Sequence, residues 1–196
     1  MGHLDRAHEY LVRSSRKRNE LDQSLYYLAQ IEIQRGDYHE ALRILKQVPL
    51  SGMTHPGIYN LMAYSLRKIG EKEMADKMVD KSFVKDPLNF AGYIERLELA
   101  EDSEKVLEKI NFIFDRRDPI FIGSQVYIET AIHYMVLGDY GLALKVLDIA
   151  EHHYMNAERI YPFLSYFKGY CLLRAGDKEG AMQYYRKAST TDHTYV

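Results

Sequence analysis

The chain has 196 residues, a formal net charge of −2 and 46% hydrophobic residues. A near-neutral charge without a basic excess argues against a nucleic-acid-binding surface, and no apolar run is long enough to span a membrane. A single cysteine excludes an internal disulfide framework and fits a reducing compartment, so a cytoplasmic location is expected. Only five prolines are present, which favours helices because proline breaks helix interiors.

The first two segments predict helices. Residues 3–18 form an amphipathic pattern in which Ala7 precedes Ala41 by the same interval that separates Leu11 from Leu45. Residues 22–55 predict two helices joined at Gly36-Asp37. Glycine can adopt the left-handed conformation that ends a helix, and aspartate can cap the next one.

The next two segments have the same length. Residues 56–89 place Gly70-Glu71 at the turn, again one such interval after Gly36-Asp37, and close with Asp86-Pro87. Residues 90–123 carry Ser103-Glu104 where the glycine turn is expected, so this unit is predicted to be degenerate, with Ser103 as the helix cap.

Two further units, 124–161 and 162–196, contain Gly138-Asp139 and Gly176-Asp177. The interval between these two turns is slightly longer than the earlier one, so the fourth unit is predicted to have a longer second helix or loop. Solenoids usually need polar terminal caps, and the last unit lacks one, so the natural chain is expected to continue. Residues 1–21 are correspondingly predicted to be the second helix of a truncated preceding repeat.

A helix, a glycine turn and a second helix, recurring with a period of about 34 residues, resemble the tetratricopeptide repeat. The resemblance covers nearly the whole chain and is specific in four of the five units. It implies an all-α, right-handed superhelix of about five helix-turn-helix repeats. A helical hairpin cannot bury its apolar face alone, so neighbouring hairpins are expected to stack and leave a long groove.

In the family that the chain resembles, the first helix of each repeat lines a concave groove. The residues that this implies for the groove are Gln23, Tyr26, Gln30, Asn60, Tyr64, Arg67, Lys68, Ile94, Glu98, Ile128, Ile132, Phe163, Tyr166 and Tyr170. The binding candidates among them are Tyr26, Gln30, Asn60, Tyr64, Arg67, Glu98, Phe163, Tyr166 and Tyr170. The set departs from the Lys, Asn and Arg residues with which some relatives hold a chaperone's C-terminal carboxylate.

The aromatic residues suggest where a ligand would bind. Phe163, Tyr166 and Tyr170 recur at i, i+3 and i+7 and share one helix face. Together with Tyr64 they form the preferred contact surface in our hypothesis, since aromatic side chains combine a large contact area with a polar group. The alternative is that Tyr166 and Tyr170 pack into a neighbouring helix or into a sixth repeat.

A narrower resemblance covers residues 56–196. Asp86-Pro87-Leu88-Asn89-Phe90, Tyr184-Tyr185-Arg186-Lys187-Ala188-Ser189 and Thr194-Tyr195-Val196 are similar to the repeat region of certain large bacterial proteins. Those proteins also carry a domain of unknown function built like sugar mutarotases or glycoside hydrolases. The resemblance implies a larger, carbohydrate-associated parent whose catalytic carboxylates would lie outside this segment.

The sequence offers no catalytic or metal-binding set. Phosphate-binding, zinc-protease and nucleophile-elbow motifs are absent, and His152-His153 diverge on a helix. Cys171 is interpreted as a small buried hydrophobe. Glu95, Glu98, Glu101 and Asp102 form an acidic helix side, interpreted as a solvated face and alternatively as a patch for a basic peptide or a cation.

We therefore expect a non-catalytic protein-protein interaction scaffold without a cofactor. Its predicted partner is a protein or peptide in the groove, or another domain of the same chain, with neither nucleic acid nor membrane involved. The alternative is a structural or oligomerisation array that packs against the catalytic part of its own chain or forms a homodimer.

Overall fold

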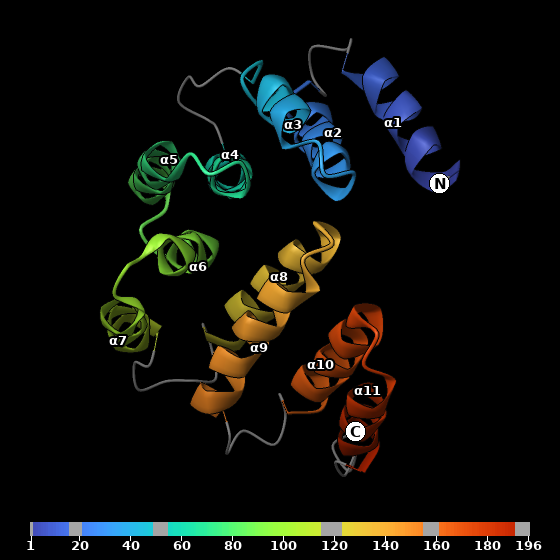
Figure 1. The fold of residues 1–196 in the computed structure, drawn as a ribbon, viewed down its shortest axis with the longest axis vertical. Helices are drawn as coiled ribbons and strands as arrows, with labels where there is room; N and C mark the ends of the chain where they lie inside the picture. Colours follow the sequence, from blue (N-terminus) through green and yellow to red (C-terminus); the bar gives the residue numbers. More distant parts are fainter. Residues whose placement is uncertain (1, 16–20, 49–54, 115–122, 155–160, 191–196) are drawn as a thin grey trace. The chain divides into compact units, whose positions relative to one another are not determined.

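The structure, a computed structural model, describes residues 2–15, 21–48, 55–114, 123–154 and 161–190. These residues form eleven helices and no strand (Figure 1). The chain divides into two compact units, Met1–Leu107 and Glu108–Val196. The predicted all-α class is confirmed.

The first unit contains three predicted first helices and their neighbours. Its elements are α1 (Gly2–Ser14), α2 (Leu21–Gln34), α3 (Tyr38–Leu45), α4 (Pro56–Lys68), α5 (Lys72–Lys85), α6 (Phe90–Leu99) and the start of α7 (Ser103–Phe114). Helices α2 and α3 pack together, as do α4 and α5, and each pair is followed by a contact to the next helix in order, α3 to α4 and α5 to α6. The first helices also touch one another, α2 with α4 and α4 with α6. Stacked helical hairpins have this pattern of contacts.

The second unit contains two hairpins. Its elements beyond α7 are α8 (Gly123–Val136), α9 (Tyr140–Tyr154), α10 (Tyr161–Ala175) and α11 (Lys178–Thr190). Helix α8 packs on α9, α10 packs on α11, and α9 contacts α10 across the junction between the hairpins. Helix α10 therefore lies against both α9 and α11.

The four predicted glycine turns share one geometry. Gly36, Gly70, Gly138 and Gly176 have φ values of 80°, 87°, 79° and 95°. At the first turn, Asp37 N donates to Glu32 O and Gly36 N donates to Ile33 O, both at 2.9 Å. These two bonds make a Schellman motif, which satisfies carbonyl groups that the end of the helix would leave unpaired.

The residue after each glycine starts the next helix. Asp37 Oδ1 accepts from Glu40 N at 2.9 Å, and Asp139 and Asp177 accept equivalent backbone N–H groups in the second unit. Glu71 makes no such side-chain bond. At the start of α7 the accepting side chain is Asp102, from Lys105 N at 3.3 Å, one residue before the predicted cap Ser103. The shorter link of Ala100, Glu101 and Asp102 explains the correction, because it leaves Ser103 as the first residue of the helix.

Small residues mark the places where helices approach closely. Ala29, Ala41, Ala63, Ala75, Ala131 and Ala143 are fully buried. In α10 the corresponding residue is Gly169, where an added Cβ would lie 2.8 Å from the Tyr185 ring. The α10–α11 crossing is therefore tighter than an alanine allows.

Candidate functional site

The predicted groove residue Asn60 is buried and paired within the first unit. Its Nδ2 donates to Asn89 Oδ1 at 3.0 Å, while Asn89 Nδ2 donates back to Asn60 Oδ1 at 2.7 Å. Asn89 is the N-cap residue of α6, so this amide pair ties the start of α6 to α4. The pair satisfies groups that would otherwise be costly to bury.

Three further candidates form a charged and aromatic cluster between α4 and α6. Arg67 Nε donates to Glu95 Oε2 at 2.9 Å, and Arg67 Nη1 lies 3.8 Å from Glu98 Oε2. The Arg67 guanidinium also lies over the buried Tyr64 ring, 5.2 Å from its centroid. These side chains therefore have partners inside the fold, and ligand binding by them remains a prediction.

The candidates on α2 are also largely enclosed. Gln30 is buried and Tyr26 is half-buried, while the neighbouring Tyr27 is exposed. Burial raises the pKa of the Tyr26 phenol, and the nearby Tyr27 raises it further. Neither residue stands out as an open contact point.

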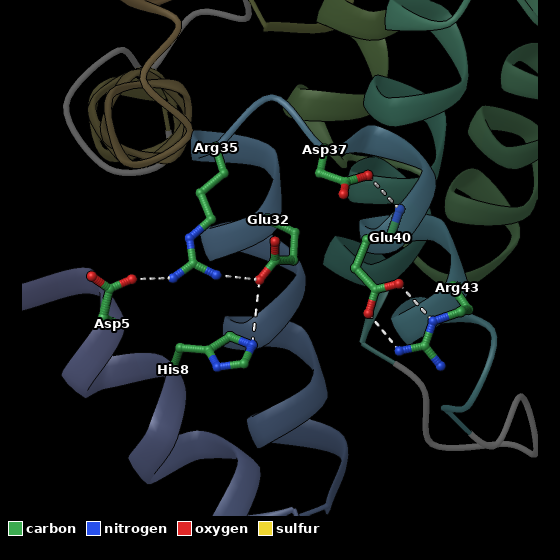
Figure 2. A network of polar contacts seen from close by, with 7 residues as sticks. All are labelled: Asp5, His8, Glu32, Arg35, Asp37, Glu40 and Arg43. Atoms are coloured by element: carbon green, nitrogen blue, oxygen red, sulfur yellow. Dashed lines mark hydrogen bonds and ion pairs between the residues drawn. The ribbon is translucent and has the colours of Figure 1, made fainter. Parts of the chain in front are cut away.

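Helix α1 is held on α2 mainly by polar contacts (Figure 2). Arg35 Nη2 donates to Asp5 Oδ1 at 2.6 Å and its Nη1 donates to Glu32 Oε1 at 2.8 Å. His8 Nε2 lies 3.4 Å from the same Glu32 oxygen. No residue of α1 is buried, so these contacts position a helix that contributes little to the core.

A second group in Figure 2 lies at the following turn. Arg43 Nε donates to Glu40 Oε2 at 2.6 Å, beside the cap bond from Glu40 N to Asp37. The Arg43 side chain lowers the pKa of the Glu40 carboxyl through this hydrogen bond. Glu40 and Arg43 are three residues apart on one helix, so the pair stabilises α3 locally.

The open aromatic surface lies on α10. Phe163 is 63% exposed and Tyr166 is 52% exposed, whereas Tyr170 is half-buried. The Tyr166 ring lies 5.8 Å from the Tyr185 ring of α11, and the Tyr170 ring lies 6.2 Å from the Tyr140 ring of α9. We call Phe163, Tyr166, Tyr170, Tyr140 and Tyr185 the α10 aromatic cluster.

A buried lysine supports this helix. Lys168 is 1% exposed, and its Nζ lies 2.7 Å from Asp148 Oδ1 and also donates to Glu151 Oε2. Burial disfavours the charged ammonium, but the hydrogen bonds to both carboxylates outweigh it, and the pKa of Lys168 is raised. The three side chains therefore join α9 to α10.

Sequence reasoning missed Lys168, although a signal existed. Lys168 is the seventh residue of its predicted repeat, a position held by the buried apolar residues Leu28 and Met62 in the first two repeats. A charge at an apolar core position needs a partner.

The remaining titratable candidates are inert. Cys171 is fully buried, and burial raises the pKa of its thiol to about 11, so the interpretation as a small hydrophobe is supported. Across the described ranges, no group of three or more His, Cys, Asp or Glu side chains could hold a metal ion. No helix in the described part of the chain combines the length and apolar character that a membrane crossing requires.

Two tetratricopeptide repeat models match the sequence, over residues 23–49 and 128–192. Three of the four glycine turns described above, at Gly36, Gly138 and Gly176, lie within these ranges. Both segments are tetratricopeptide repeats. The predicted repeat limits at 56–89 and 90–123 lie outside the matches and remain predictions.

Solved structures similar to the chain include other repeat proteins. A thermophilic TPR protein of Thermus thermophilus is 18% identical, with 89% of this chain and 93% of that chain covered and a TM-score of 0.45. MamA of Desulfovibrio magneticus RS-1, from residue 41 onward, is 17% identical, with 89% and 96% covered and a TM-score of 0.43. No curated protein sequence gave a significant match.

Proposed function

We propose that the chain is a non-catalytic protein-interaction scaffold that binds a peptide or protein segment on α10. The observation that carries this proposal is the exposure of Phe163 and Tyr166 on the first helix of a tetratricopeptide hairpin. Aromatic side chains dominate interface energies because they bring a large, rigid contact area. Soluble proteins rarely leave neighbouring aromatic residues open without a use.

The tightness of the hairpin supports the same surface. Gly169 lets α10 approach α11 closely, and Lys168 ties α10 to α9. A helix fixed on two sides presents its exposed residues with little loss of conformational entropy on binding. The other predicted groove residues Asn60, Tyr64, Arg67 and Glu98 have partners within the fold, so α10 is the better contact surface.

The proposal is tested by selecting displayed 12-residue peptides on the immobilised chain. Enriched peptides are then titrated by fluorescence anisotropy against the unchanged chain and the Phe163→Ser/Tyr166→Ser variant. We expect the double variant to weaken binding by about tenfold or more, as loss of two interface anchors does. The matched control is Val84→Ser/Leu88→Ser, which removes two exposed apolar residues of the first unit. Equal binding by both variants contradicts the proposal.

A second candidate is self-association through the same hairpin, because Leu173 and Met182 are exposed there as well. Sedimentation of the chain separates the two functions. A monomer over a broad concentration range favours a binding module, whereas a dimer that Phe163→Ser/Tyr166→Ser dissociates favours a homodimer.

The wider context also belongs to the proposal. A larger, carbohydrate-associated bacterial parent would place this array beside a catalytic domain of its own chain, in a cytoplasmic setting. The reading frame upstream of Met1 tests that idea directly, since a mutarotase-like domain must appear there.

A further inference from the structure

The hydroxyl groups of the α10 aromatic cluster lie near one another. The pKa of the Tyr185 phenol is raised first by burial and then by the phenols of Tyr166 and Tyr170. The ring contacts agree, with Tyr166 beside Tyr185 and Tyr170 beside Tyr140. Three helices, α9, α10 and α11, thus contribute tyrosines to one surface of the second unit.

These hydroxyls are available as donors. Within the described ranges, the hydroxyls of Tyr166, Tyr170 and Tyr185 donate no hydrogen bond, and the contacts of these side chains involve their rings. A tyrosine hydroxyl is both a donor and an acceptor. The surface can therefore donate to backbone carbonyl groups of a bound segment.

The charge around the cluster is positive. Residues 161–190 contain five Lys or Arg residues and two Asp or Glu residues, although the whole chain has a net charge of −2. The Lys168 charge is already matched by Asp148 and Glu151. Arg174 is exposed at the far end of α10, with its guanidinium 5.2 Å from the Tyr140 ring centroid. An acidic group therefore has a favourable position beside the aromatic rings.

The spacing fits an extended ligand. Phe163 and Tyr170 are seven residues apart, about 10 Å along a helix, and Arg174 follows about 6 Å further on. A polyproline II segment repeats every three residues, about 9 Å, and leaves its backbone carbonyls free. From this match we infer that the occupant is a proline-rich segment in the polyproline II conformation, with an acidic residue that pairs with Arg174.

This inference rests on the proposed function and specifies its ligand. Aromatic-lined surfaces bind proline-rich segments at low entropic cost, because the segment is already extended. An amphipathic helix has its backbone carbonyls bonded internally, so it offers few acceptors to the tyrosine hydroxyls. The charge and the hydroxyl donors together therefore favour the extended ligand.

The test uses four fluorescein-labelled probe peptides and the full chain in anisotropy titrations. The first is octaproline flanked on both sides by Glu-Glu, and the second carries Lys-Lys instead. The third replaces the prolines by Gly-Ser repeats between Glu-Glu flanks, and the fourth is a helical Ala-Leu peptide with the same flanks. We expect the first probe to bind about fivefold tighter than the second and about tenfold tighter than the third and fourth.

Variants connect the binding to the surface. Phe163→Ser/Tyr166→Ser is expected to weaken the first probe about tenfold, and Tyr166→Phe, which removes one hydroxyl, about threefold. Arg174→Glu is expected to reverse the preference between the first two probes. Arg186→Glu, a charge reversal on the exposed side of α11, is the control and is expected to keep the preference.

Each other outcome has a definite meaning. If the third or fourth probe binds as tightly as the first, and Phe163→Ser/Tyr166→Ser abolishes that binding, the proline-rich ligand is wrong while the α10 surface stands. The same conclusion follows if displayed peptides bind at α10 and the first probe does not. If the first probe binds the double serine variant unchanged, the surface assignment is also wrong. A dimer that depends on Phe163 and Tyr166 makes a second copy the occupant and overturns the inference.

Discussion

Lys168 Nζ lies 2.7 Å from Asp148 Oδ1, across the contact between α9 and α10. The same relationship occurs in the first unit, where Arg96 Nη2 lies 2.6 Å from Asp80 Oδ1 between α5 and α6. Lys168 and Arg96 are each the seventh residue of their predicted repeats, and Asp148 and Asp80 are each the twenty-fifth. Two repeat junctions therefore use one pair of positions for an ion pair.

This relationship predicts an unequal effect of removing its two sides. Asp148→Asn/Glu151→Gln leaves the buried ammonium without a countercharge and is expected to lower the free energy of unfolding by about 3 kcal/mol or more. Lys168→Met leaves carboxylates that reach solvent, and about 1 kcal/mol or less is expected. Urea unfolding of both variants measures the difference. A larger loss for Lys168→Met would contradict the burial argument.

The amide pair between α4 and α6 predicts a second asymmetry. Asn60→Ala leaves the buried Asn89 amide without its partner and is expected to lower the free energy of unfolding by about 1–3 kcal/mol. Asn60→Leu/Asn89→Leu removes both amides, so it is expected to be less destabilising than two single losses added together. Simple additivity in denaturant titrations would show that the two amides act independently.

The turns were predictable from sequence because their cause is local. The left-handed glycines Gly36 and Gly138 and their aspartate caps depend only on a few neighbouring residues. Burial of the predicted groove residues was not predictable in this way. Asn60 and Tyr64 are enclosed where α4 contacts α2 and α6, and the spacing within one helix does not reveal how closely other first helices approach it.

The open residues of α10 followed from spacing only in part. The i, i+3, i+7 pattern placed Phe163, Tyr166 and Tyr170 on one face, and two of the three are exposed. Tyr170 is half-buried against Tyr140, a contact that depends on how α9 and α10 pack. Long-range packing therefore decided which predicted contact residues are accessible.

The close crossing at Gly169 predicts overpacking. A Cβ there would lie 2.8 Å from the Tyr185 ring and 3.2 Å from the Ala181 carbonyl oxygen, which is backbone and yields little. Gly169→Ala is expected to lower the free energy of unfolding by about 1–3 kcal/mol despite the higher helix propensity of alanine. Gly141→Ala at the start of α9, where the nearest such contact is 3.8 Å, is the matched control. Equal urea midpoints for the two variants would place α10 further from α11.

His133 predicts an acid-dependent loss of stability. Burial lowers the pKa of its imidazole to about 4 from the ordinary 6.5. The unfolded chain therefore binds a proton near pH 6.5 while the folded chain does not, and stability falls as the pH drops from about 6.5 to about 4. His133→Phe removes this component, so its stability relative to the unchanged chain should rise over that interval. A pH-independent difference between the two unfolding series would contradict the assignment.

The central claim is that a ligand covers the exposed face of α10, and hydroxyl-radical footprinting measures it most directly. Side-chain oxidation of Phe163 and Tyr166 is compared with and without a saturating display-selected peptide, and the exposed Tyr10 of α1 serves as the internal control. The account predicts a severalfold drop in oxidation at Phe163 and Tyr166 and no change at Tyr10. Unchanged oxidation of Phe163 and Tyr166 while the peptide is bound would contradict it.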